Sequence, residues 1–277
     1  MKKKLIPILL IIIVLVSLFF VYKNLTQKKE TNIDVVVPPV ATEPEGLIVS
    51  GSFESKVLSP TDLYVKNEVK YPYFKNAGND FNLKIENFIK QVMEEHDKMS
   101  KDNWMARYDT QVKGDNIPKV PATEEDKFYF SSDFTIIQSN STYISFVLKY
   151  GGFSGGAHGY ENNISFNYDV KNQKIIELKD LFPNDKEYLN YLSTKSREFL
   201  KKQDFAKVSE EDKKNSTPEA LKQFLDSITS SIEMGTEPKI ENFSVFTFTP
   251  DKVKIYFGQY QVGPYVIGMP EVEIDRK

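Results

Sequence analysis

The pattern of apolar and polar positions divides the chain into one apolar N-terminal run and a long region of mixed periodicity. Residues 5–22 are almost continuously apolar, interrupted only by Pro7 and Ser17. A run of this length just suffices to cross the hydrocarbon core of a bilayer as a helix. Pro7 falls in the first turn, where a missing N–H costs little. We therefore expect a transmembrane helix over residues 5–22.

Two interpretations of this run compete, a cleaved signal peptide and an uncleaved signal anchor. The run ends in Phe19-Phe20-Val21-Tyr22-Lys23, without the small residues of a cleavage site, which favours the anchor. Lysines flank the run on both sides, and only the free amino terminus and Glu30 favour an N-terminus inside the cell. The expected order in the cell membrane is a cytoplasmic tail (1–4), an anchor (5–22), a proline-containing linker (23–46) and an extracytoplasmic domain (47–277).

Beyond the linker, alternating positions predict strands and three-to-four-residue spacing predicts helices. Strands are expected at 64–74, 128–137, 142–150, 164–170, 174–178, 243–248 and 253–257, with short ones at 47–49, 53–58 and 271–274. One helix should follow Asn79, a second should be capped by Asp185, and a third should start at Thr217-Pro218 and stop at Gly235.

Residues 102–126 should be irregular, and Phe199, Phe224 and Leu225 should lie on inward helix faces. Hairpins outnumber strand–helix–strand units, so the expected fold is α+β. It comprises an antiparallel sheet built from hairpins, with about three helices packed on it. A division into subdomains 47–127 and 128–277 is one option.

Composition excludes several classes of site. Cysteine is absent, which removes disulfides, thiolate zinc sites, a nucleophilic cysteine and a lipidated cysteine. The two histidines, His96 and His158, cannot form a three-histidine metal site within one chain, and no metal or cofactor is expected. The formal net charge of −3 makes nucleic acid a poor partner. No Gly-x-Ser-x-Gly or His-Glu-x-x-His motif occurs, so no catalytic residue is assigned.

A glycine-rich segment, Gly151–Gly159, is the sharpest local feature. Its glycines indicate a backbone that needs positive φ or close approach. Under one interpretation it cradles a ligand with Gly152, Gly155 and Gly156 and with His158 as polar contact. Under the other it is a tight connection between strands, with His158 hydrogen-bonded to the backbone. His96 falls on the apolar stripe of the first helix and is interpreted as a buried side chain rather than a ligand.

A second unusual segment, Gln259–Pro270, combines two tyrosines with two glycines and two prolines. It is either a loop that closes the core or a recognition surface formed by Tyr260 and Tyr265. Tyrosine suits recognition because it presents a rigid apolar ring with a polar tip.

Four segments together carry a resemblance to a known family. They are Gly155-Gly156-Ala157-His158, Phe166-Asn167-Tyr168-Asp169, Ile176–Phe182 and Phe257–Tyr265, preceded by Val69–Phe74. Over residues 64–274 the chain resembles the extracytoplasmic domain of RsiV-type anti-sigma-V factors. It is also similar to the non-catalytic region that precedes the deacetylase domain of PdaC-type peptidoglycan deacetylases.

The resemblance implies binding rather than catalysis. In the anti-sigma members this domain senses lysozyme outside the cell, but residues 1–4 offer no sigma-binding segment here, and no catalytic deacetylase domain is evident. The first hypothesis is a membrane-anchored module that recognises peptidoglycan, a muramidase or another envelope protein. The second is a cell-wall hydrolase that uses His158 with a nearby carboxylate such as Asp169. The third is a structural partner of another membrane protein.

Overall fold

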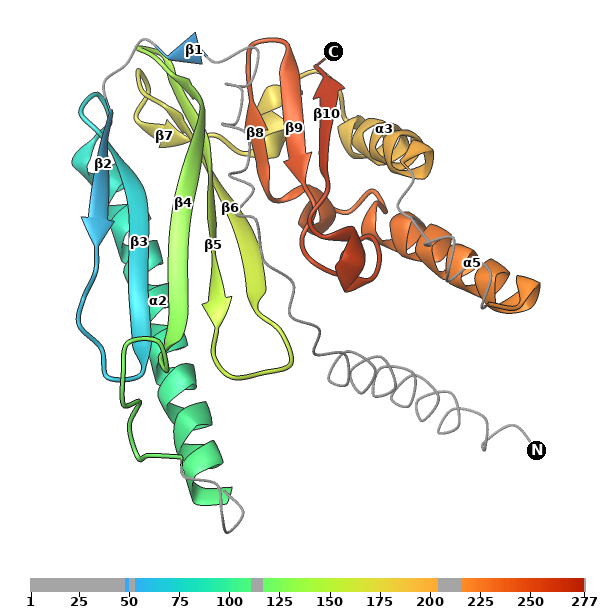
Figure 1. Cartoon of the computed structure of the whole chain (residues 1–277). Helices are drawn as coiled ribbons and strands as arrows, with labels where there is room; N and C mark the ends of the chain where they lie inside the picture. The colour runs from blue at the N-terminus through green and yellow to red at the C-terminus, as the bar shows by residue number, and fades with distance from the viewer. Residues whose placement is uncertain (1–47, 50–52, 111–116, 204–215, 277) are drawn as a thin grey trace, which may run out of the picture. The chain divides into compact units, whose positions relative to one another are not determined.

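The computed structural model describes residues 48–49, 53–110, 117–203 and 216–276 (Figure 1). The predicted anchor at 5–22 and the linker at 23–46 lie outside these residues. Within the described ranges, no helix is both long and apolar enough to cross a membrane.

The first half of the described chain forms a mixed sheet covered by one long helix. Seven strands take part: β1 (Ile48–Val49), β2 (Phe53–Leu58), β3 (Val65–Phe74), β4 (Phe128–Ser139), β5 (Tyr143–Phe153), β6 (Tyr160–Asp169) and β7 (Lys174–Ile175). Their order is β2-β3-β4-β5-β6-β7, with β1 added to β4. The antiparallel pairs β4–β5 and β6–β7 are the two hairpins that the alternating pattern predicts, and β5 also pairs with β6 in antiparallel fashion.

The expectation of a purely antiparallel sheet is wrong for two pairs of strands. Strand β3 pairs with β4 in parallel, with Val65 opposite Phe128, and β1 also runs parallel to β4. The helix α2 (Asn79–Thr110) connects β3 to β4 and forms the crossover that a parallel pair requires. The α+β class is confirmed, but the sheet is mixed because both β3 and β1 pair with β4 in parallel.

Helix α2 is longer than expected because its buried stripe continues past residue 102. The buried positions Met93, His96, Ser100 and Trp104 follow one another at three or four residues, which keeps them on one face. Trp104 packs edge-on against Phe128, and its Nε1 donates to the carbonyl of Pro118 at 3.0 Å. The prediction that residues 102–110 are irregular is therefore wrong.

The second half has a core of its own. A three-stranded antiparallel sheet contains β8 (Phe246–Phe248), β9 (Lys252–Tyr256) and β10 (Glu271–Asp275) in the order β10-β9-β8. Helices α3 (Tyr188–Lys202) and α5 (Pro218–Gly235) belong to this half. The cap of α5 is confirmed: the Thr217 hydroxyl accepts from the N–H of Ala220, and Pro218 opens the helix.

Three predicted inward side chains prove to be substantially exposed: Phe199 at 40%, Phe224 at 37% and Leu225 at 40%. Only Ile228, Ile232 and Gly235 of α5 are buried, all in its C-terminal half. The apolar stripe on α5 therefore extends further along the helix than the described core does.

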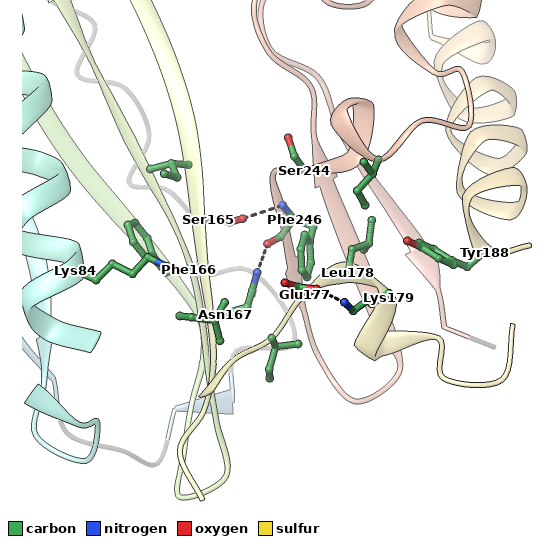
Figure 2. A pocket seen from close by; sticks show the side chains of 14 residues that line it. Lys84, Ser165, Phe166, Asn167, Glu177, Leu178, Lys179, Tyr188, Ser244 and Phe246 are labelled. Carbon is green, nitrogen blue, oxygen red and sulfur yellow. Dashed lines mark hydrogen bonds and ion pairs between the residues drawn. The ribbon is translucent and has the colours of Figure 1, made fainter. Parts of the chain in front are cut away.

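Strand β8 joins the two halves through side chains rather than through another strand. Its free edge faces β5 and β6, and Ser145 Oγ accepts from the Phe248 N–H at 3.0 Å while Ser165 Oγ accepts from the Phe246 N–H at 2.9 Å. The Phe246 carbonyl accepts from Asn167 Nδ2 at 2.7 Å (Figure 2). The Phe248 carbonyl accepts from Gln138 Nε2 at 2.9 Å. Buried polar groups need such partners, so these four bonds fix how the halves meet.

Candidate functional site

Three of the predicted site residues meet at one surface, although about a hundred residues separate the segments that carry them. His158 lies just before β6, and Tyr260 and Tyr265 lie between β9 and β10. The ring centroids of His158 and Tyr265 are 4.3 Å apart, and those of Tyr260 and Tyr265 are 5.9 Å apart. The tyrosines are 55% and 41% exposed, and His158 is exposed as well. We call these three side chains the aromatic surface.

Hydrogen bonds fix the orientation of the imidazole in this surface. His158 Nδ1 is 2.8 Å from the carbonyl oxygen of Gly159, and a carbonyl only accepts, so Nδ1 donates. In the neutral ring Nε2 then accepts, and its partner at 3.2 Å is the Tyr260 hydroxyl. The backbone bond of the structural interpretation and the side-chain cluster of the ligand interpretation are thus both present.

Tyr260 adopts a backbone conformation that favours glycine. Its φ is +66°, within a turn in which the Gln261 N–H donates to the Gly258 carbonyl. For a non-glycine residue this region costs about 1–2 kcal/mol. Gln261 holds the turn in place, because its Oε1 accepts from the Gly258 N–H and its Nε2 donates to the carbonyls of Gly235 and Asn242. A strained turn that presents an exposed aromatic ring is typical of a functional position.

The glycines of the predicted loop divide by environment. Gly152 is buried inside β5, where a Cβ would come within 2.1 Å of the Tyr129 carbonyl oxygen. Gly155 has a φ of +96° and packs against the Phe128 ring. A Cβ on Gly156 would meet nothing closer than 3.9 Å. The structure thus supplies packing reasons for Gly152 and Gly155, whereas Gly156 lies open beside the aromatic surface.

A shallow depression of about 320 Å³ on the solvent-facing side of the sheet adjoins the aromatic surface. Its lining includes Tyr129, Lys70, Lys149 and Glu161. Gly159 connects the two features: its carbonyl accepts from the Tyr265 hydroxyl at 3.5 Å, and a side chain there would come within 3.3 Å of the Tyr129 hydroxyl. Sequence reasoning missed Tyr129, whose alternating strand position gives no sign that it extends this site.

His96 is structural, as the sequence suggests. It is only 1% exposed, and its Nδ1 lies 2.8 Å from the Tyr160 hydroxyl, while its ring packs against Phe130. Burial lowers the pKa of His96 to about 4, although the Tyr129 backbone opposes part of this shift. Its Nε2 makes no hydrogen bond of good geometry within the described residues.

This buried imidazole predicts a loss of stability in mild acid. The unfolded chain takes up a proton at its histidines near pH 6.5, but the folded chain resists protonation of His96 down to about pH 4. The free energy of unfolding should therefore fall by about 2 kcal/mol between pH 7 and pH 5, on the linkage slope for one proton. Urea titrations at both pH values would measure this. The neutral variant His96→Gln should lose most of the pH dependence, and an equal slope in the variant would contradict the assignment.

The hydrolase hypothesis fails for the pair that the sequence suggested. Asp169 is at the far end of β6 from His158, about 30 Å away at the usual rise of a strand. It is buried, and its carboxylate accepts from the N–H and the Nδ2 of Asn172. Among the described residues, no group of three histidine, aspartate or glutamate side chains is placed to hold a metal ion.

Comparison with known proteins divides the chain in the same way as its two cores do. Residues 60–161 match the family model described as "Deacetylase PdaC", and residues 179–277 match the one described as "Protein of unknown function (DUF3298)". The chain is 26% identical over 269 residues to a peptidoglycan-N-acetylmuramic acid deacetylase PdaC of Bacillus subtilis (strain 168). The match covers 97% of this chain and 48% of that protein, so the chain spans about half the length of its curated relative.

One solved structure agrees with the fold. A DUF3298 family member from Bacteroides fragilis NCTC 9343 has a TM-score of 0.51 and 19% identity, covering 82% of this chain and 90% of the other. A DUF3298 protein from Pseudomonas aeruginosa PAO1 gives a TM-score of 0.42 and 16% identity, covering 81% and 88%. The resemblance to the non-catalytic region of PdaC-type proteins is thus confirmed. The resemblance to anti-sigma factors stays a prediction.

Proposed function

We propose that this chain is a membrane-tethered module that recognises peptidoglycan outside the cytoplasm. The observation that carries the proposal is the aromatic surface, which two distant segments build and a strained turn presents to solvent. In this proposal the apolar run at 5–22 supplies the tether.

The chemistry of the surface suits a sugar polymer. Exposed aromatic rings offer flat apolar faces to the C–H faces of sugar rings, and their hydroxyl tips offer hydrogen bonds. The adjoining depression adds charged and hydroxyl groups for the polar substituents of the glycan. The Bacillus subtilis relative is named as a deacetylase of peptidoglycan, which supports the same class of ligand here.

The test is co-sedimentation of the full-length chain, in detergent, with purified peptidoglycan sacculi. We expect retention that free muropeptides compete away, and about a tenfold loss of affinity for Tyr260→Ala or Tyr265→Ala, the usual effect of removing a central aromatic contact. Tyr260→Gly should also lose binding, yet be more stable than Tyr260→Ala by about 1 kcal/mol, because glycine relieves the positive φ. Phe224→Ala on α5 is the matched control, because it also removes an exposed aromatic side chain but one that is not part of the aromatic surface.

Two results would speak against the proposal. Full retention of both tyrosine variants would remove the aromatic surface from recognition. Failure of the unmodified chain to sediment with sacculi would remove the wall as ligand and make a lysozyme-like muramidase, or another envelope protein, the leading candidate.

A further inference from the structure

Among the residues that the structure describes, no strand pairs with most of the outer edge of β6. Its only neighbour on that side in the described chain is β7, which pairs with Tyr168 and Asp169 alone. The Asn167 carbonyl also accepts from the Ile176 N–H, and there the pairing stops. An open edge presents backbone donors and acceptors to any extended chain that can pair with them.

The register shows which backbone groups face outward. In an antiparallel strand the N–H and C=O of alternate residues point to the same side. Asn167 points toward β7, so the backbone groups of Ser165, Asn163 and Glu161 face the same open side. These three residues could form the ladder of an added strand.

A cavity of about 590 Å³ opens on this edge at its downstream end (Figure 2). The four consecutive residues 164–167 all line it. Successive side chains of a strand point to opposite faces, so a cavity that touches all four must open at the strand edge. Its far wall is apolar and includes Ile175 and Ile240, which are 39% and 43% exposed.

The rim of this cavity favours an anion. Lys84 and Lys179 both line it, together with Glu177. Lys179 is paired with Glu177 at 2.6 Å, whereas Lys84 makes no ion pair with any residue that the structure describes. Two lysines and one glutamate leave one positive charge, carried by Lys84.

The upstream end of the same edge lies at the aromatic surface, because His158 and Gly159 directly precede β6. From Tyr160 to Ser165 the strand extends about 17 Å. An extended peptide of about four residues reaches about 13 Å, from the cavity to about Glu161, and the sugar attached to it would cover the remaining distance to the aromatic surface.

We propose that the β6 edge binds the peptide stem of peptidoglycan as an added strand. The stem pairs with the backbone at Asn163 and Ser165, and its terminal carboxylate meets Lys84, while the sugar to which it is attached lies on the aromatic surface. This inference rests on the proposed function, to which it adds the peptide half of the ligand.

The test compares the full-length chain and its variants by titration with three probes: a disaccharide tetrapeptide muropeptide, the same muropeptide amidated at its terminal carboxylate, and peptide-free glycan. Asn163→Pro removes one outward N–H, a change that an edge strand tolerates. It should weaken muropeptide binding about tenfold and leave glycan binding unchanged. Asn163→Ala keeps the N–H and should bind normally. Lys84→Gln should weaken binding of the free carboxylate form and not of the amidated form.

Several results would overturn the inference. If the unmodified chain binds glycan and muropeptide equally, the stem is not recognised, although the proposed function stands. If Asn163→Pro and Lys84→Gln both bind muropeptide normally, the peptide stem does not bind at the β6 edge. An extended segment of a protein partner then becomes the candidate for that edge. If the chain binds none of the probes, the proposed function fails and this inference fails with it.

Discussion

Replacing Gly152 by alanine is expected to lower the free energy of unfolding by about 3 kcal/mol or more, at the upper end of what overpacking costs. The added Cβ would come within 2.1 Å of the Tyr129 carbonyl oxygen and within 2.9 Å of the His96 ring. Both neighbours are fixed, the first by the β4–β5 ladder and the second by burial on α2. The strands would have to separate, which would also disturb the segment that leads to His158.

Gly156→Ala is the matched control within the same glycine cluster. Its Cβ would have no neighbour closer than 3.9 Å, so the free energy of unfolding should change by less than about 0.5 kcal/mol, as for most surface substitutions. Urea titration of the full-length chain, followed by the fluorescence of Trp104, would measure both variants. Equal stability of the two would show that β5 adapts and that Gly152 is not held by close packing.

The glycine cluster illustrates what sequence can predict about the site. Its composition correctly marks an unusual backbone, but composition does not separate Gly152, which is needed for packing, from Gly156, which is open. The sequence marks the segments with His158 and Tyr260 as candidates for recognition. Their meeting depends on how the halves are joined, and local patterns carry no information on that contact.

The fold shows the same division between local and distant information. Periodicity and capping predict local elements, as at Thr217 and Pro218, where the cap is confirmed. The parallel pairing of β3 with β4 requires knowing that α2 crosses over the sheet, and hairpin counting does not reveal it. The prediction that Phe224 and Leu225 of α5 are buried is wrong. Amphipathic spacing shows which face of a helix is apolar, but it does not show how far along the helix the rest of the protein covers that face.

The join between the halves explains one of the four segments that carry the family resemblance. Asn167 in Phe166-Asn167-Tyr168-Asp169 is 3% exposed, and both the nitrogen and the oxygen of its side-chain amide form hydrogen bonds. Its Nδ2 donates to the Phe246 carbonyl, and its Oδ1 accepts from the Ser145 hydroxyl at 2.7 Å. The same Ser145 hydroxyl oxygen accepts from the Phe248 N–H, so the Asn167 amide orders two of the four bonds that join the halves. These bonded residues are up to 103 positions apart, which hides this role from any local pattern.

Asn167→Ala is therefore expected to lower the free energy of unfolding by about 3–4 kcal/mol, since it leaves two buried polar groups without partners at about 1–3 kcal/mol each. Asn163→Ala is the control, since it lies on the same strand and the same face but is not fully buried.

The pattern of unfolding should change as well as the stability. Trp104, the only tryptophan, lies in the first core, whereas far-UV circular dichroism also reports α3 and α5 in the second half. In the unmodified chain the two signals should change together, because the contact at β8 couples the halves. In Asn167→Ala the circular dichroism transition should begin at lower urea than the Trp104 transition. Coincident transitions at unchanged stability would mean that apolar packing and the remaining bonds from Gln138 and Ser165 suffice to join the halves. In that case the aromatic surface, which needs both halves in register, would not depend on Asn167.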